Sequence, residues 1–196
     1  NLASVQLERN DFSSAIKNAN LSIAYLTTLN DLNGLGETHN ILGMVYKEQK
    51  VYSLASSNFN QALVYYESTS NKEKIASVFH NVGTVFKEQG KYTNSLNYLN
   101  RSIKIREQYG AQNQIYQTYR TIADVYKDVH NTEKSLEYME LYLNYLDSNT
   151  ILQSATKIAE LSESYRSEQR ERLINLQADS IQRQQQERSL TATKLE

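Results

Sequence analysis

A repeat with a period of 40 residues constrains this chain more than any other feature, because a segment that recurs without gaps must fold in the same way each time. Residues 42–49 match residues 82–89 and residues 122–129 column by column. Residues 2–6 occupy these columns one period earlier, so we expect the chain to begin inside a repeat. The second half of the repeat aligns as well, since one column holds only small residues: Ala15, Ala55, Ser95 and Ser135.

Each repeat is predicted to form two amphipathic helices joined by a short break. In the second repeat the first helix is predicted over residues 37–49, with one face at the i, i+3, i+4, i+7 spacing: His39, Leu42, Gly43 and Tyr46. A second helix follows the break at residues 50–51, with these inward positions: Ala55, Phe59, Ala62, Leu63 and Tyr66. The break column holds Asn10, Lys50, Gly90 and His130. Polar linkers are predicted between repeats, at residues 30–34, 70–73 and 110–113.

Small residues fall where the two helices of a repeat must approach closely, as in the column of Gly43, Gly83 and Ala123. An isolated helix pair cannot bury its apolar face, so neighbouring repeats must stack into a superhelix. We therefore predict an all-α repeat array over residues 1–149. It divides into a partial repeat and three further repeats, at residues 1–34, about 35–74, 75–114 and 115–149.

The residue composition of the sequence changes at about residue 150. Residues 151–196 contain no Gly and no aromatic residue except Tyr165, and after Tyr165 apolar residues such as Leu173, Leu176, Ile181 and Leu190 are sparse. We predict one long polar helix over residues 150–196, which caps the array or carries a signal, or forms a dimer contact. Its heptad pattern is too weak to indicate a coiled coil.

Composition excludes several classes of function. The chain has 196 residues, a net charge of -1, no Cys and no Pro, and only six Gly. A near-neutral chain is unlike a dedicated nucleic-acid binder, and a chain without Cys has no disulfide or zinc ribbon. No apolar run approaches about 18 residues, and residues 1–4 lack the pattern of a signal peptide, so we expect neither element in this sequence. Scarce Gly and absent Pro favour helices over turn-rich β folds.

No arrangement of residues points to catalysis, a metal or a cofactor. His39, His80 and His130 are about one repeat apart, without the spacing that places two ligands on one helical face. His39 shares a column with Phe79 and Tyr119, so we expect it to be packed in the core. Carboxylates are spread along helical faces. We predict a non-enzymatic protein without metal or cofactor.

The repeat columns resemble the tetratricopeptide repeat, in which an apolar residue, Gly and an aromatic residue precede a small–aromatic–small second helix. The second repeat carries this pattern: Leu42, Gly43, Tyr46, Ala55, Phe59 and Ala62. The fourth repeat departs from it, with Tyr142 in place of a small residue and Ala123 in place of Gly. The resemblance implies a right-handed all-α superhelix. The period exceeds the usual 34 residues, and acidic residues (Glu67, Glu107 and Asp147) stand where the family places Pro, so we expect longer second helices.

The resemblance also implies a concave groove that binds a protein or peptide segment. In this register its wall comprises Asn40, Met44, Lys47, His80, Asn81, Thr84, Lys87, Arg120, Asp124 and Lys127. Such polar side chains hydrogen-bond an extended peptide, and Arg120 suits a carboxylate. The alternative is that they are only solvated. Chaperone-binding members carry basic residues at positions held here by Asn40, Gln117 and Thr121, so a chaperone clamp is not expected.

Basic and acidic columns run side by side through the repeats, at Lys47-Glu48, Lys87-Glu88 and Lys127-Asp128. Adjacent residues on a helix do not face one another. We therefore expect ion pairs between residues of neighbouring repeats, and not between the two adjacent residues of each Lys-Glu or Lys-Asp sequence.

A narrower resemblance concerns residues 141–148 and 157–168, which come after the 40-residue repeats. This junction resembles bacterial membrane-bound signalling proteins, in which a tetratricopeptide sensor leads into a polar helix, a transmembrane helix and a histidine kinase or DNA-binding output domain. It implies a ligand-sensing region, periplasmic, whose only link to a membrane is a transmembrane segment of the parent protein. The alternative is a self-contained cytoplasmic scaffold or peptide-binding regulator.

Overall fold

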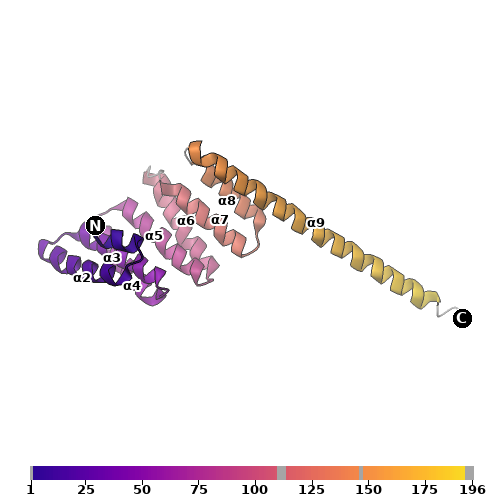
Figure 1. Ribbon diagram of the computed structural model, residues 1–196, viewed down its shortest axis with the longest axis horizontal. Helices are drawn as coiled ribbons and strands as arrows, with labels where there is room; N and C mark the ends of the chain where they lie inside the picture. The colour runs from indigo at the N-terminus through magenta and orange to yellow at the C-terminus, as the bar shows by residue number, and fades with distance from the viewer. Residues whose placement is uncertain (1, 110–113, 146–147, 193–196) are drawn as a thin grey trace. The chain divides into compact units, whose positions relative to one another are not determined.

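Every regular element in the described part of the chain is an α-helix (Figure 1). The computed structural model describes residues 2–109, 114–145 and 148–192, with side chains in the last range described for 158–178 and 181–183. The helices are α1 (Leu2–Glu8), α2 (Phe12–Leu29), α3 (Leu32–Glu48), α4 (Tyr52–Ser68), α5 (Lys72–Glu88), α6 (Tyr92–Tyr109), α7 (Ile115–Asp128), α8 (Thr132–Asn144) and α9 (Ser148–Ala192). The predicted all-α fold is confirmed.

The chain divides into two compact units, Asn1–Tyr145 and Leu146–Glu196. In the first unit, helices pack most extensively in consecutive pairs, α3 with α4, α5 with α6 and α7 with α8. The first helices of successive repeats, α1, α3, α5 and α7, also contact one another in order. This arrangement makes the pairs into a stack with one face built from first helices, and Figure 1 shows the pairs succeeding one another along the unit.

The second unit contains α9, a helix of 45 residues that Figure 1 shows as uninterrupted. Four of its described apolar side chains are exposed, Leu173, Ile174, Leu176 and Ile181, whereas Ile158, Leu161 and Tyr165 are half-buried. None of the described helices combines the length and the hydrophobicity that crossing a bilayer requires.

α3 begins at Leu32, five residues before the predicted start at residue 37, and α5 begins at Lys72, so the predicted polar linkers at 30–34 and 70–73 are too long. The side chains of Asp31 and Asn71 accept hydrogen bonds from the backbone N–H groups of Gly34 (2.9 Å) and Lys74 (3.2 Å). Such caps satisfy N–H groups that a helix start leaves unpaired. The polar residues after them therefore form the first helical turn. The predicted linker at 110–113 lies outside the described residues.

Second helices run as far as the absence of Pro predicts. α4 extends to Ser68 and α6 to Tyr109, so Glu67 and Glu107 are both helical. Pro at these two positions would end or kink the helices. Asp147 lies outside the described residues.

The break within each repeat depends on one residue in the left-handed region of backbone space. The predicted break column has positive φ in all four repeats: Asn10 (58°), Lys50 (60°), Gly90 (71°) and His130 (58°). At the second break, the backbone N–H of Lys50 donates to Lys47 O and that of Val51 to Tyr46 O, both at 2.8 Å. These bonds satisfy carbonyls at the end of α3 and reverse the chain. Only Gly90 adopts this conformation without a steric penalty from Cβ.

The close approach of paired helices is visible at the glycine column. A Cβ atom on Gly43 would lie 2.5 Å from the Phe59 ring, and one on Gly83 would lie 2.7 Å from Leu99. The fourth repeat has Ala123 here, while the column of Phe59 and Leu99 holds Met139, whose side chain adapts more readily.

A hydrogen bond shows that α7 and α8 of the fourth repeat also approach closely at this point. Ser135 Oγ donates to Ala123 O at 2.9 Å, as Ser95 Oγ donates to Gly83 O at 2.8 Å in the third repeat. Ala123 and Ser135 are both buried.

The first helix pair differs from the others. α1 has 7 residues, whereas α3 and α5 each have 17. α2 exposes large apolar side chains: Leu21, Tyr25 and Leu29.

We predict that Lys50→Gly raises the free energy of unfolding by about 0.5–1 kcal/mol, because relief of the left-handed penalty exceeds the extra entropy of glycine in the unfolded chain. Urea denaturation measures this change. The matched control is Lys104→Gly at an exposed helical position of α6, which should lose about 1 kcal/mol. Equal losses from the two substitutions would contradict the role assigned to the turn.

A second prediction concerns the glycine column. Gly43→Ala should lower the free energy of unfolding by about 1–2 kcal/mol, because overpacking against Phe59 outweighs the better helix propensity of alanine. Phe59→Met introduces the pairing of the fourth repeat. The double variant should then be less destabilised than the sum of the two single variants by about 1 kcal/mol in a double-mutant cycle. Additive losses would show that the two positions do not limit each other.

Candidate ligand-binding face

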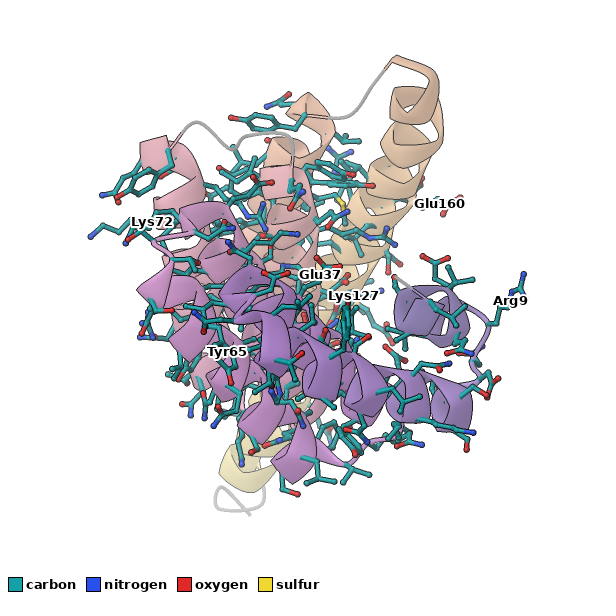
Figure 2. All side chains as sticks on the ribbon, turned by 90° about the vertical axis from the view of Figure 1, so that its left-hand side faces the viewer. Arg9, Glu37, Tyr65, Lys72, Lys127 and Glu160 are labelled. Atoms are coloured by element: carbon teal, nitrogen blue, oxygen red, sulfur yellow. The ribbon has the colours of Figure 1, made fainter. Side chains whose placement is uncertain are left out.

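The predicted groove residues lie on α3, α5 and α7, the first helices that contact one another along the stack. These helices carry, in order, Asn40, Met44 and Lys47; His80, Asn81, Thr84 and Lys87; and Arg120, Asp124 and Lys127. Arg120 and Lys127 (the latter labelled in Figure 2) are exposed, and the other eight are half-buried. We call this set of ten side chains the first-helix face.

Much of the hydrogen-bonding capacity of this face joins neighbouring repeats. Asn81 Nδ2 donates to Asn40 Oδ1 at 2.9 Å, which links α5 to α3. Lys87 Nζ lies 3.5 Å from Asp124 Oδ2, which links α5 to α7. These groups therefore support the stack, and binding a peptide through them would compete with those contacts.

Two other predicted groove residues are engaged in packing or in their own helix. Met44 packs against the apolar cores on both sides of α3. Thr84 Oγ1 donates to the backbone oxygen of His80 at 3.0 Å. The structure thus places both residues on the predicted face but uses their side chains locally.

The charged columns form ion pairs both between neighbouring repeats and between adjacent residues of one helix. Lys47 Nζ lies 3.9 Å from Glu88 in the next repeat, as expected for pairing between repeats. It also lies 2.7 Å from its neighbour Glu48, so the prediction that adjacent residues do not pair is wrong at this position. The lysine side chain is long and flexible enough to reach the carboxylate of the adjacent residue. Lys87 pairs with Asp124 and not with the acidic residue of the Glu88 column.

The three histidines occupy different environments. His39 is half-buried, lies 3.0 Å from Asn58 Oδ1 and stacks on Tyr65, which Figure 2 labels. His130 lies in the α7–α8 turn, as predicted. His80 Nδ1 lies 3.2 Å from Thr118 Oγ1 on α7. Burial, and then the charges of Arg106 and Lys47, lower the pKa of His80 to about 4, so the ring is neutral at pH 7.

A pocket of about 480 Å³ opens at the C-terminal end of the first-helix face. Three predicted residues line it, and four further residues complete it: His80, Arg120 and Asp124, with Tyr116, Gln117, Thr121 and Tyr142. Volumes of about 300–1,000 Å³ are typical of ligand sites. The structure therefore brings together part of the predicted set, mainly that on α7, at one concave site.

Two tyrosines in the pocket replace small residues of the earlier repeats. The column of Tyr116 holds Gly36 and Ala76, and the column of Tyr142 holds Ala62 and Ser102. In the third repeat Ser102 Oγ donates to Ala76 O at 2.7 Å, so the two helices touch there. In the fourth repeat the rings of Tyr116 and Tyr142 occupy those columns, with centroids 6.0 Å apart. The sequence signal for this pocket is the change from small to aromatic residues in both columns. The departure of the fourth repeat is evident from the repeat pattern at Tyr142, but the matching change at Tyr116 is not part of that pattern.

Among the described residues, no group of three or more His, Cys, Asp or Glu side chains is placed to hold a metal ion.

Comparisons with known proteins agree with this geometry. The family model described as Tetratricopeptide repeat matches residues 32–108 and 74–148. No curated protein sequence matches significantly. BtubC from P. vanneervenii is similar in structure with a TM-score of 0.71 and 15% identity, covering 84% of this chain and 70% of that chain.

Two further structures share the fold. A putative kinesin light chain from P. anserina has a TM-score of 0.66 and 13% identity over 86% of this chain and 85% of its own. The N-terminal domain of stress-induced protein-1 from C. elegans has a TM-score of 0.54 and 14% identity over 67% and 97%. At these identities the likeness concerns the fold alone.

We predict that the free energy of unfolding falls by roughly 2–3 kcal/mol between pH 6.5 and pH 4 because of His80. In this range the unfolded chain binds a proton at His80 that the folded chain does not, so stability decreases as pH decreases. Urea denaturation across this range should show a smaller decrease for His80→Gln than for the natural chain. Thr118→Val, which removes the hydroxyl but keeps the buried ring, is the control and should retain the decrease. Identical pH profiles for His80→Gln and the natural chain would contradict the assignment.

Proposed function

Because the chain belongs to the tetratricopeptide repeat family, whose repeats form protein-interaction modules, we propose that it is the ligand-sensing region of a bacterial signal-transduction protein. The ligand is a protein or peptide segment bound on the first-helix face. The observation that carries the binding role is the pocket at the C-terminal end of that face, where Arg120 is exposed. No catalytic role is part of this proposal.

The sensing role is supported by the long helix that comes after the repeats in the chain. α9 continues for 45 residues, about 67 Å at 1.5 Å per residue, long enough to carry a conformational signal away from the repeats. A ligand that binds one curvature of the stack more tightly would shift the population toward that curvature, and α9 would pass the change to an output domain. In this proposal the region is periplasmic and belongs to a membrane-anchored parent.

A second candidate is a self-contained cytoplasmic scaffold or peptide-binding regulator. The exposed apolar side chains of α9, among them Ile174 and Leu176, favour it, because they suit a helix that pairs with a second copy. Binding on the first-helix face is common to both candidates. They differ in whether that binding is coupled to α9.

Spin-label distances test this coupling, and the absence of Cys lets labels be attached at any chosen pair of introduced cysteines. Peptides selected by display on the natural chain provide the ligand, and scrambled peptides provide the control. Labels at exposed Lys17 and Lys104 report curvature, and labels at Lys104 and Ile174 report the tail. We expect the selected peptide to shift both distances, with helix displacements on the order of 1–2 Å at each repeat contact. A bound peptide that leaves both distances unchanged would refute sensing and leave the binding module.

A further inference from the structure

Arg120 differs from Lys47 and Lys87, the half-buried lysines of the first-helix face, in having no acidic partner within 4.0 Å among the described residues. Lys47 pairs with Glu48 and Glu88, and Lys87 pairs with Asp124. In the described part of the chain, no carboxylate oxygen lies within 4.0 Å of the Arg120 guanidinium, although Arg120 lines the pocket. An exposed guanidinium beside a concave surface offers a planar fork of donors that matches a carboxylate.

The groups around Arg120 leave the pocket positive. Asp124, the acidic residue of the lining, is engaged by Lys87, and His80 is neutral at pH 7. Near His80 lies the guanidinium of Arg106, only 3% exposed and hydrogen-bonded to three neutral side chains: Ser102 (3.3 Å), Gln114 (3.0 Å) and Ser77 (3.2 Å). Glu73 offsets part of this charge, and because burial limits screening by solvent, the field of Arg106 still reaches His80 in the pocket.

The tyrosines add an apolar wall and hold the cation. The guanidinium carbon of Arg120 lies 5.9 Å from the centroid of the Tyr142 ring, which in turn lies 6.0 Å from that of Tyr116. Stacking on an aromatic face steadies a guanidinium while leaving its N–H groups available. An apolar group that accompanies a carboxylate therefore finds ring surface next to the cation.

We infer that this pocket binds a carboxylate attached to an apolar or aromatic group, supplied by an acidic side chain or the C-terminus of a peptide. This rests on the proposed binding function of the first-helix face and names the chemistry that the face selects. The recognising residues are Arg120, Tyr116 and Tyr142. They are not the positions of Asn40, Gln117 and Thr121, where chaperone-binding members of the family carry basic residues.

The test uses two probes of nearly equal shape, phenylacetate and phenylacetamide, titrated into the ¹⁵N-labelled natural chain and monitored by NMR. We expect phenylacetate to bind in the millimolar range, with shifts centred on the amides of Gln117, Arg120 and Thr121, and to weaken as salt is raised. Phenylacetamide should bind at least about 10-fold more weakly, because it lacks the charge. Equal affinities for the two probes would overturn the inference.

A pair of arginine variants separates the pocket from general charge. Arg120→Gln should weaken phenylacetate binding by about 10-fold or more. Arg101→Gln is the matched control, since it removes the same charge from a guanidinium that lies 4.0 Å from the Phe79 ring and outside the pocket lining. It should leave binding unchanged. Equal weakening by the two variants would show a nonspecific charge effect and overturn the inference.

Peptides distinguish the two sources of the carboxylate. A peptide ending in Phe with a free C-terminus is compared with its amide, and an internal Phe-Glu peptide with its Phe-Gln counterpart. The carboxylate comes from the pair in which the neutral peptide binds more weakly than the charged peptide to the natural chain, while the two bind equally to Arg120→Gln. If the neutral peptide binds as tightly as the charged one in both pairs, the inference is overturned. The sensing role is tested separately, because the spin-label experiment uses independently selected peptides.

Discussion

The separation of the two helices within each repeat is the constraint on which the rest of this structure depends. At Gly43 and Gly83 the first helix lies so close to Phe59 and Leu99 that a single additional carbon would collide with them. This contact fixes where the second helix lies, and therefore which side of the first helix faces away from it. The ligand-binding face is what remains of the first helices once this contact has been made.

The same constraint explains the pocket. In the third repeat the paired helices also touch between Ala76 and Ser102. The fourth repeat keeps the contact at Ala123 but carries Tyr116 and Tyr142 at the other point, and a hollow lies beside those rings. A repeat that is nearly regular at one contact and bulky at the next produces a recess without an insertion or a new element.

Sequence reasoning predicted the features that repeat and missed those that depend on tertiary register. The columns of Gly43 and Lys50 were recognised because several repeats present them, and the structure gives both a physical reason. The early helix starts were missed because a capping residue such as Asp31 looks like linker until its bond to Gly34 is seen. The bond between Asn81 and Asn40 was not predictable, since the spacing of side chains across neighbouring helices is set only by the assembled stack.

The short first helix has a consequence for how the array comes apart. A stack in which each repeat contacts only its neighbours has a stability that is a sum of local terms, and a repeat at an end loses one of them. α1 is short, and α2 leaves Leu21 and Tyr25 exposed to water. Packing between these two helices therefore contributes less to the free energy of unfolding than packing within the other pairs. In a chain of these 196 residues, amide hydrogens of α1 and α2 are therefore expected to exchange faster than those of α5, whose apolar side chains are largely buried. The pocket is lined from α5, α7 and α8, so its lining draws no residue from this weakly buried pair.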